Sequence, residues 1–416
     1  MIELVFLIGV LLLFGFAATL FFERTGISEI LVLMAAGIII GPAFGIVDAS
    51  AGSVLAGAAG FMTVLALILM LFDGGLTFEI SSILRAMPLA FGFTTLTFAL
   101  SMGFVAAVAN LAFGMDWLPA LLLGAALSGT SSAIVLPMVS KLRSSEQTRA
   151  MLAIESTITD AFTLIVGLTI LDLMLGNGDV SNTPAKLMSS LSSAVFIGII
   201  LAGVWVALLR RLNENTYSYM LTLATVFIAY ALSEFFGGNG VIAVFVFGLV
   251  LGNAGKIAEL LKLNQKDYEV DPEIRRMQQE ISFFVRTFFF VYMGLLMTGS
   301  TFKETAILLS AAIVVVSLVA RWLSVKIFSS QIPADERNLV AFMMPRGLAA
   351  AVLVTIPASK GITIPFFAET IMITILLTNI IATLGMFAFK RGDTGAEQAK
   401  PAATDAQKGP KVIRTS

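Results

Sequence analysis

Four oxygen-bearing side chains recur at helical spacing in a long apolar stretch in the first half of the chain. Ser156, Thr159, Asp160 and Thr163 follow an i, i+3, i+4, i+7 pattern, which places them on one stripe of a helix. A stripe of hydroxyls around one carboxylate suits a dehydrated monovalent cation, because such ions prefer oxygen ligands. The same carboxylate can instead hold a proton. One group that takes either a proton or a cation, but not both, is sufficient to exchange them.

Asp160 is not the only ionisable residue in the apolar segments. A charge at the centre of a bilayer costs roughly 2.5–3.5 kcal/mol on insertion scales, so these residues mark functional or paired positions. Glu155 lies about 140° around the helix from Asp160. We therefore expect it to form an ion pair with a buried arginine, Arg321 or Arg346. Asp73 lies near the end of its segment and is either an acid of an access funnel or a charge at the membrane interface.

The composition is that of a membrane protein. Of the 416 residues, 58% are hydrophobic and 13% are charged, against roughly 45–50% and about 25% in soluble domains. A soluble fold cannot hide so much apolar surface, so we expect lipid to surround most of the chain. The net charge is −1 and no long basic stretch occurs, which argues against nucleic acid as a partner.

The chain contains no cysteine and no histidine. This excludes disulfides, iron–sulfur clusters, metal sites built on thiolate or imidazole, cysteine nucleophiles and Ser-His-Asp catalysis. Proton chemistry near neutral pH must then use a carboxylate or a lysine. We expect no enzyme activity and no cofactor; the ligands would be transported ions.

Thirteen apolar segments predict an all-α polytopic membrane protein with 13 transmembrane helices. Most segments reach the ~20 residues that a spanning helix needs. The first lacks a basic leader and a small-residue cleavage site, so we interpret it as a retained helix and not as a signal peptide. The predicted spans are residues 2–22, 29–47, 58–78, 88–112, 117–140, 149–175, 189–209, 217–235, 239–254, 281–300, 304–326, 338–358 and 363–389.

An odd number of spans puts the two termini on opposite sides of the membrane. Most of the 26 lysines and arginines lie in the loops of one side and in the C-terminal tail, whereas the opposite loops hold Lys186, Lys303 and Lys360. The positive-inside rule then predicts an external N-terminus and a cytoplasmic C-terminus, in a plasma or inner membrane. Residues 391–416 are polar, so we expect a disordered cytoplasmic tail, too short to be a nucleotide-binding domain.

The two halves of the chain share short glycine-containing motifs at nearly constant offsets. Two six-helix units separated by one helix would be inverted relative to each other, a plan of secondary transporters whose sites lie at the midplane where helices break. The matching pairs are 37–42 with 248–253, 75–76 with 294–295, and 128–130 with 346–348.

Two of the segments contain matching breaks near mid-span. Gly129, Ser131 and Ser132 interrupt the fifth segment, and Pro345 and Gly347 interrupt the twelfth. Glycine and proline weaken a helix, and the freed backbone carbonyls can face a cation. We therefore expect broken helices 5 and 12 that cross each other. The alternative is that these small residues only let helices pack closely.

Four motifs carry a resemblance to a known family. Phe-Asp-Gly-Gly-Leu at 72–76 resembles a family motif FEGG, and Glu155-Ser156-x-x-Thr159-Asp160 resembles ES-x-x-ND. Ala320-Arg321 and Arg346-Gly347 resemble an arginine-bearing helix and an R-G pair. The family is the monovalent cation/proton antiporters, in their sodium/proton exchanger (NhaP/NHE-like) branch, and the resemblance covers about residues 1–390.

The resemblance implies a homodimer with two parts in each protomer. The dimerisation part would comprise about residues 1–80 and 217–300. A mobile core part would comprise about residues 88–175 and 304–389. The helix at about 189–209 would link the two parts.

The resemblance also implies roles for single residues. Asp160 matches the aspartate that binds the cation and the proton, with Ser156, Thr159 and Thr130 as further ligands. Glu155 matches the glutamate that pairs with an arginine. The implied activity is exchange of a monovalent cation for H⁺ by alternating access, with Na⁺ as the first expectation and Li⁺ or K⁺ as alternatives. One acid before the helix break favours electroneutral exchange.

Asp73 matches the family's funnel acid, but two other positions depart from the family pattern. Thr159 replaces an asparagine, and Thr130-Ser131-Ser132 replaces T-D-P. The run Gly-Thr-Ser-Ser-Ala-Ile-Val at 129–135 is similar to the Kef-type potassium/proton branch. A Kef-like K⁺/H⁺ efflux system or channel-like K⁺ pathway is therefore the alternative. An intramembrane aspartyl protease using Asp73 and Asp160 is disfavoured, because its G-x-G-D motif is missing.

Overall fold

Long apolar helices make up this computed structural model, which describes residues 2–45, 54–77, 87–142, 144–176, 183–211, 217–263 and 268–398. These residues contain no strand; in lipid a helix satisfies its backbone groups within one segment. The helices are α1 (Ile2–Thr25), α2 (Glu29–Ile38), η1 (Ile39–Ala43), α3 (Val54–Thr77), α5 (Met87–Leu111), α6 (Trp117–Ala126), α7 (Ser132–Ser140), α8 (Glu146–Leu175), α9 (Thr183–Leu209), α10 (Ser218–Phe235), α11 (Gly240–Gly252), α12 (Ala254–Leu260), α13 (Pro272–Leu296), η3 (Gly299–Phe302), α14 (Glu304–Ile327), α15 (Arg337–Phe342), α16 (Leu348–Ser359) and α17 (Phe367–Gln398).

Seven helices of the described residues are long and apolar enough to cross a membrane. The number is eight if α11 and α12, which meet at a bend of 66°, form one span. Shorter apolar helices include α6 and α16, because a break divides the fifth and twelfth predicted segments. Length and composition therefore establish a polytopic helical membrane protein.

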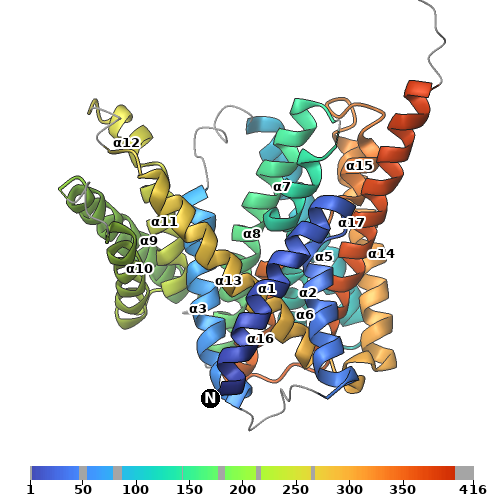
Figure 1. Ribbon diagram of the computed structural model, residues 1–416, viewed down its shortest axis with the longest axis horizontal. Coiled ribbons are helices and arrows are strands. Elements are labelled where there is room, and N and C mark those ends of the chain that lie inside the picture. The colour runs from blue at the N-terminus through green and yellow to red at the C-terminus, as the bar shows by residue number, and fades with distance from the viewer. Residues whose placement is uncertain are drawn as a thin grey trace, which may run out of the picture.

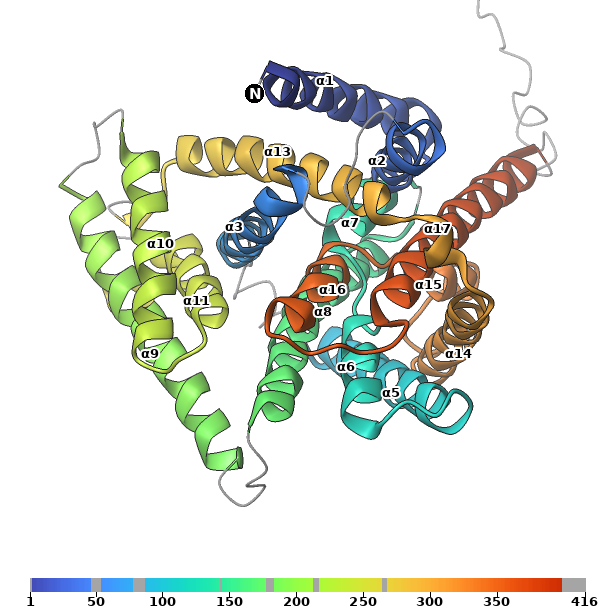
Figure 2. The ribbon, with the colours of Figure 1, turned by 90° about the horizontal axis from the view of Figure 1, so that it is seen from below.

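The helices pack as two groups (Figure 2). In the first group, α11 packs against α3, α9 and α10, and α13 packs against α2 and α3. In the second group, α5 and α14 pack against each other, and α6, α7 and α16 surround α8. Contacts between the groups are sparse and run mainly through α3, α8 and α16. The first group also contains α9, which corresponds to the predicted linker.

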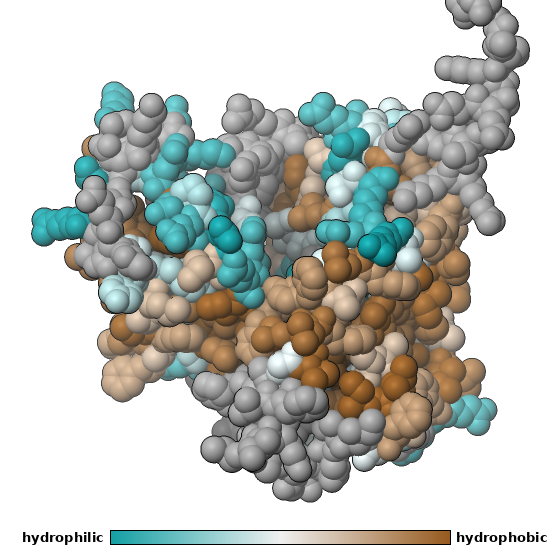
Figure 3. All heavy atoms as spheres, viewed as in Figure 1, coloured by the Kyte–Doolittle hydropathy of each residue, from teal (hydrophilic) through white to brown (hydrophobic). Residues whose placement is uncertain are grey.

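The described chain starts and ends at opposite edges of the bundle (Figure 1). The start of α1 lies at the lower edge and the end of α17 at the upper edge. Most hydrophilic residues on the viewed face gather along the upper edge, and a broad hydrophobic band lies below them (Figure 3). This surface is what a lipid-embedded bundle requires.

Two helices begin earlier than their apolar segments. Helix α13 begins at Pro272 and not near residue 281, because Asp271 caps it by accepting a hydrogen bond from the Glu273 amide at 2.8 Å. Helix α8 begins at Glu146, where the Ser145 hydroxyl accepts from the Thr148 amide at 3.2 Å. Hydropathy marks the apolar part of a helix, whereas caps mark where the helix begins.

The C-terminal helix extends beyond its predicted end. Helix α17 runs to Gln398, so the first part of the predicted disordered tail is helical. A helix that leaves the apolar region can continue until a residue stops it, and the next proline is Pro401. Residues 399–416 lie outside the described part of the chain.

Glycines let two helix pairs of the first group touch backbone to backbone. A Cβ at Gly37 would overlap the backbone of α13 beside Gly294. A Cβ at Gly75 would overlap the backbone of α11 at Phe245, beside Gly248. Because the obstacle is backbone, it cannot move aside as a flexible side chain would. These contacts fix α2 against α13 and α3 against α11.

Replacing Gly75 with alanine should destabilise the protein, because the added methyl group must push α3 away from α11. We expect a loss of about 1–3 kcal/mol in the free energy of unfolding, seen as a lower thermal unfolding midpoint of the purified protein in detergent. Gly74→Ala is the matched control, since a Cβ at Gly74 would meet no atom of the described residues within 4 Å. Equal midpoints for the two variants would contradict this packing.

Candidate ion-binding site

Two broken helices meet in the second group. Helix α6 ends at Ala126 and α7 begins at Ser132, while α15 ends at Phe342 and α16 begins at Leu348. The two breaks touch: the Ser131 amide donates to the Pro345 carbonyl at 2.9 Å. Gly347 makes this approach possible, because a Cβ there would overlap the Ser131 hydroxyl. The structure therefore places the predicted helix-break residues together.

Two buried arginines bind the carbonyls that these breaks leave free. Nη1 of Arg346 donates to the carbonyls of Ser128 and Gly129, both at 2.7 Å. Nε of Arg321 donates to the Val340 carbonyl at 2.6 Å. Each guanidinium thus lies at the C-terminal end of a half-helix, where the helix dipole favours positive charge.

Side chains of α17 hold the second break in position. The Arg346 amide donates to Thr378 Oγ1 at 3.1 Å, and Asn379 Nδ2 donates to the Arg346 carbonyl at 2.7 Å. Asn379 Oδ1 accepts from the Ser28 hydroxyl at 2.8 Å. Thr378 and Asn379 are fully buried. The backbone of Arg346 is therefore bonded although it lies outside a helix.

Asp160 lies in the middle of α8 and faces the start of α7. Its Oδ2 accepts hydrogen bonds from the Ser132 amide at 3.0 Å and the Ser132 hydroxyl at 2.7 Å. The carboxylate therefore caps a half-helix at the end where the dipole favours negative charge. Among the described residues, no lysine or arginine lies within ion-pair distance of Asp160. Its charge is balanced by a helix end and not by a fixed cation.

Asp160 lines a large cavity between the two helix groups. The cavity has an empty volume of about 1400 Å³, including its open mouth. Asp73 lines the same cavity, so the structure brings the two predicted acids to one space. Asp73 Oδ1 is buried and has no hydrogen-bond partner among the described residues. The other polar lining residues are Thr77, Ser131, Ser132, Thr157, Gln279, Ser282 and Arg286.

The face of α8 that lines the cavity differs from the predicted hydroxyl stripe. The lining residues are Thr157, Asp160, Ala161 and Leu164, which again follow an i, i+3, i+4, i+7 pattern. Asp160 belongs to both patterns. The cavity face is thus rotated from the predicted face, and Asp160 lies where the two overlap.

The hydroxyls of Thr130, Ser156 and Thr159 bind backbone groups or each other, and no described hydrogen bond joins them to the Asp160 carboxylate. Thr159 Oγ1 accepts from the Thr130 amide at 3.0 Å and lies 3.3 Å from Thr130 Oγ1. The Ser156 hydroxyl donates to the Ala153 carbonyl at 3.1 Å. Thr163 packs beside Gly129, where a Cβ would overlap its hydroxyl. These side chains pack α8 against the first break, and their role as ion ligands stays a prediction.

Glu155 pairs with Arg321 and not with Arg346. The two salt-bridge contacts are 2.5 Å from Arg321 Nη1 to Glu155 Oε1 and 2.9 Å from Nη2 to Oε2. Both side chains are at most 2% exposed. The Arg321 guanidinium also lies 5.8 Å from the centre of the Phe93 ring. This bidentate pair ties α8 to α14, away from the cavity.

Sequence reasoning missed several residues of this site. Ser132 was predicted only as a helix-break residue, yet it binds Asp160. Thr378 and Asn379 were not singled out, although two neighbouring polar residues within a long apolar segment are a usable signal. Gln279 lies on α13 before the predicted span at 281–300, whereas Ser282 and Arg286 lie within that span but were given no role.

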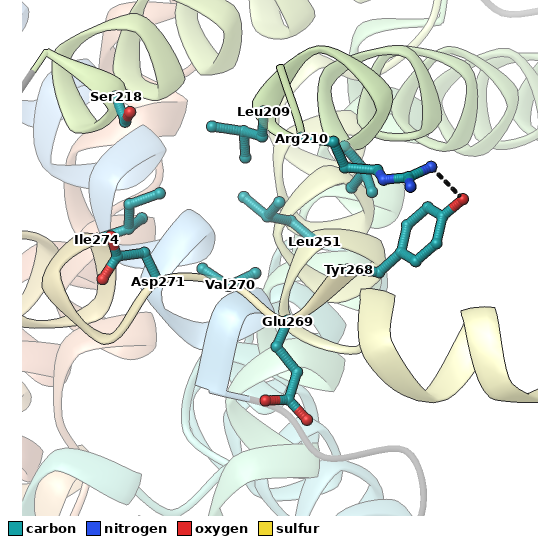
Figure 4. A pocket seen from close by; sticks show the side chains of 10 residues that line it. Leu209, Arg210, Ser218, Leu251, Tyr268, Glu269, Val270, Asp271 and Ile274 are labelled. Atoms are coloured by element: carbon teal, nitrogen blue, oxygen red, sulfur yellow. Dashed lines mark hydrogen bonds between the residues drawn. The ribbon is translucent and has the colours of Figure 1, made fainter. Parts of the chain in front are cut away.

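A second pocket lies at one edge of the first helix group (Figure 4). Its empty volume is about 400 Å³. Arg210 Nη1 donates to the Tyr268 hydroxyl at 2.7 Å across its mouth. Its acids are Glu269 and the α13 cap Asp271. None of its lining residues lines the Asp160 cavity, so it is separate from the candidate site.

The chain belongs to the sodium/hydrogen exchanger family, because the model of that family's transmembrane region matches residues 9–390. The chain is 27% identical to the K⁺/H⁺ antiporter NhaP2 of Shewanella sp. over 82% of this chain and 58% of that protein. It is 28% identical to the low-affinity Na⁺/H⁺ antiporter NhaS1 of Synechocystis sp. over 70% of this chain and 58% of that protein. It therefore spans less than two thirds of the length of these curated relatives.

Another relative matches over nearly its whole length. The chain is 25% identical to Na⁺/H⁺ antiporter 1 of Methanocaldococcus jannaschii over 92% of this chain and 94% of that protein. Its fold matches the structure of the sodium proton antiporter MjNhaP1 from the same organism at pH 8, with a TM-score of 0.75 and 24% identity. That match covers 94% of this chain and 98% of the other.

Replacing Glu155 with glutamine should mainly reduce stability. Removing one partner of a buried ion pair leaves the Arg321 charge uncompensated, which costs about 3–5 kcal/mol. We expect a lower yield of folded protein and a lower unfolding midpoint in detergent. A Glu155→Gln protein as stable as the wild type but unable to transport would instead place Glu155 in the transport site.

Proposed function

We propose that this chain exchanges a monovalent cation for H⁺ across a membrane by alternating access. Asp160 is the shared site, which holds either a proton or the cation. The curated relatives are antiporters of Na⁺ or K⁺ for H⁺ by name, and this proposal extends that activity to the present chain. We keep Na⁺ as the first candidate, with K⁺ and Li⁺ as alternatives.

The observation that carries the proposal is the setting of Asp160. A mid-helix carboxylate that faced lipid, or that was locked onto a guanidinium, would be unable to exchange ions. Asp160 instead faces a cavity that it shares with Asp73, and its partner is a helix start at Ser132. A hydrogen-bonded carboxylate with no fixed cation can release a proton when a cation arrives.

Helix packing supports an inverted repeat. The motif match relates the second segment to the ninth and the third to the tenth. In this match Gly37 corresponds to Gly248, and Gly294 corresponds to Gly75. The contact between Gly37 and Gly294 therefore has an equivalent between Gly248 and Gly75, and the structure contains both contacts. The packing of α5 against α8 has its counterpart in α14 against α17. We therefore propose 13 spans in two inverted six-helix repeats with helices 5 and 12 broken.

The two helix groups support a division into two parts. We propose that the first group forms the dimerisation part of a homodimer and that the second forms the mobile core, with α9 as the linker. The sparse contacts between the groups, in contrast to the packing within them, favour relative motion. Asp160 belongs to the core, while Asp73 belongs to the dimerisation part.

The proposed orientation has the N-terminus outside and the C-terminus in the cytoplasm. The bias of lysine and arginine between the two sets of loops supports it. The cavity is lined by the C-terminal end of α3 and the N-terminal half of α13. Both belong to the predicted cytoplasmic side, so this conformation would be open to the cytoplasm.

In the proposed cycle a cation enters the cavity, displaces the proton of Asp160 and binds its carboxylate. The core then moves against the dimerisation part and exposes Asp160 to the other side. One carboxylate at the helix break predicts exchange of one cation for one proton, which is electroneutral. Transport that does not saturate with cation concentration would favour the channel-like K⁺ pathway instead.

Replacing Asp160 with asparagine should abolish cation-driven proton movement, because an amide can neither carry the proton nor balance the cation. The measurement is dequenching of a pH dye in proteoliposomes on addition of Na⁺, Li⁺ or K⁺ in turn, which also gives the ion preference. Asp172→Asn is the matched control, since Asp172 lies on the same helix and outside the cavity lining. Exchange retained by Asp160→Asn would refute the assignment.

Alanine at Ser132 should raise the apparent KM for the cation about threefold to tenfold, because an oxygen within 2.7 Å of the Asp160 carboxylate is lost. The same substitution at Ser156 removes a hydroxyl that lies outside the cavity lining. Initial rates against cation concentration would compare the two variants. A larger effect at Ser156 would favour the predicted stripe over the cavity face as the ion-binding surface.

A further inference from the structure

Arg286 brings a positive charge to the cavity that contains Asp160 and Asp73. It belongs to α13 and lines the cavity together with both acids. Its side chain is 26% exposed. The cycle proposed above gives it no task, yet any cation that reaches Asp160 must pass through the space it lines. A fixed positive charge there would repel that cation.

The contacts of Arg286 leave it incompletely paired. Its Nη2 lies 3.8 Å from Glu29 Oε1, at the start of α2. This is beyond hydrogen-bond distance, and both Arg286 Nε and Glu29 Oε1 are buried without a hydrogen-bond partner among the described residues. Glu29, Arg286 and Pro137 line a second, smaller pocket beside the cavity. The guanidinium is therefore loosely held and has room on two sides.

Asp73 is the other carboxylate available to Arg286. Arg286 and Asp73 line the same cavity. Asp73 Oδ1 is also buried without a hydrogen-bond partner among the described residues. One guanidinium thus faces two acids from two elements, Glu29 from α2 and Asp73 from α3.

We propose that Arg286 is a positioning residue that sets the apparent cation affinity by exchanging between Glu29 and Asp73. When Arg286 pairs with Glu29, Asp73 keeps its negative charge and attracts the cation into the cavity. When Arg286 pairs with Asp73, that charge is neutralised and the cavity attracts the cation less. Glu29 thereby acts at a distance, by holding the guanidinium away from Asp73. This inference rests on the exchange function proposed above.

The proposal predicts opposite signs for two neighbouring substitutions. Arg286→Gln leaves Asp73 unpaired and should lower the apparent KM about threefold to tenfold. Glu29→Gln releases Arg286 onto Asp73 and should raise the apparent KM by a similar factor. The double variant Glu29→Gln/Arg286→Gln should resemble Arg286→Gln, because Glu29 acts through Arg286. Arg286→Lys keeps the charge and should stay nearer to the wild type.

The experiment is the initial rate of Na⁺- and K⁺-driven proton movement against cation concentration in proteoliposomes, repeated in an Asp73→Asn background. The effect should fall on KM more than on the maximal rate, and Arg286→Gln should lose most of its effect when Asp73 is absent. Shifts of the same sign for Arg286→Gln and Glu29→Gln would overturn the proposal. So would an Arg286→Gln effect of equal size in the Asp73→Asn background.

Two controls separate this inference from the function on which it rests. If the wild type shows no cation-driven proton movement, or if Asp160→Asn retains it, the proposed function fails. If exchange depends on Asp160 but the sign pattern is absent, only the role of Arg286 fails. Elution of each variant as a single symmetric peak in detergent shows that it is folded, and a folded Arg286→Gln protein with unchanged KM also overturns the proposal.

Discussion

The structure depends on one constraint: backbone groups freed inside an apolar bundle must find partners within the protein. Breaking α6–α7 and α15–α16 in the interior exposes carbonyls and amides that lipid cannot bond. The chain satisfies them with ionised side chains at the helix ends. Arg346 binds the carbonyls at the end of α6, Arg321 binds one in α15, and Asp160 binds the amide at the start of α7.

This arrangement explains why so few buried charges have such different roles. Arg321 has a carboxylate partner in Glu155, and the two form a bidentate ion pair that does not line the cavity. Among the described residues, the Arg346 side chain has only carbonyl partners, so its positive charge remains where the two broken helices meet. Within the described part of the chain, the Asp160 carboxylate is bonded only to Ser132, at the start of α7. A carboxylate bonded to a helix start, and not to a guanidinium, stays free to take up a small ion.

The sequence predicts much of this, because intramembrane charges and helix breaks are rare enough to be conspicuous. Asp160, Glu155, Arg321 and Arg346 stand out in apolar segments by the cost of burying a charge. The orientation of α8 could not be predicted, since a stripe of hydroxyls is equally suited to an ion or to a neighbouring helix. Thr159 bonds to Thr130, 29 residues away in sequence, and only the packing of α8 against the first break shows this. The predicted start of α13 was wrong, because the Asp271 cap determines where the helix begins and hydropathy does not detect a cap.

The hydrogen bond from Ser131 to Pro345 has a mechanical consequence. It joins the two broken helices, which come from opposite halves of the chain, and Arg346 adds further hydrogen bonds to the carbonyls of Ser128 and Gly129. Neither broken helix can then move without the other, so the two helices behave as one rigid unit. Under the proposed cycle, an ion bound to Asp160 would move with this unit and keep its ligands, so the energetic barrier to transport would lie in sliding the two helix groups past each other.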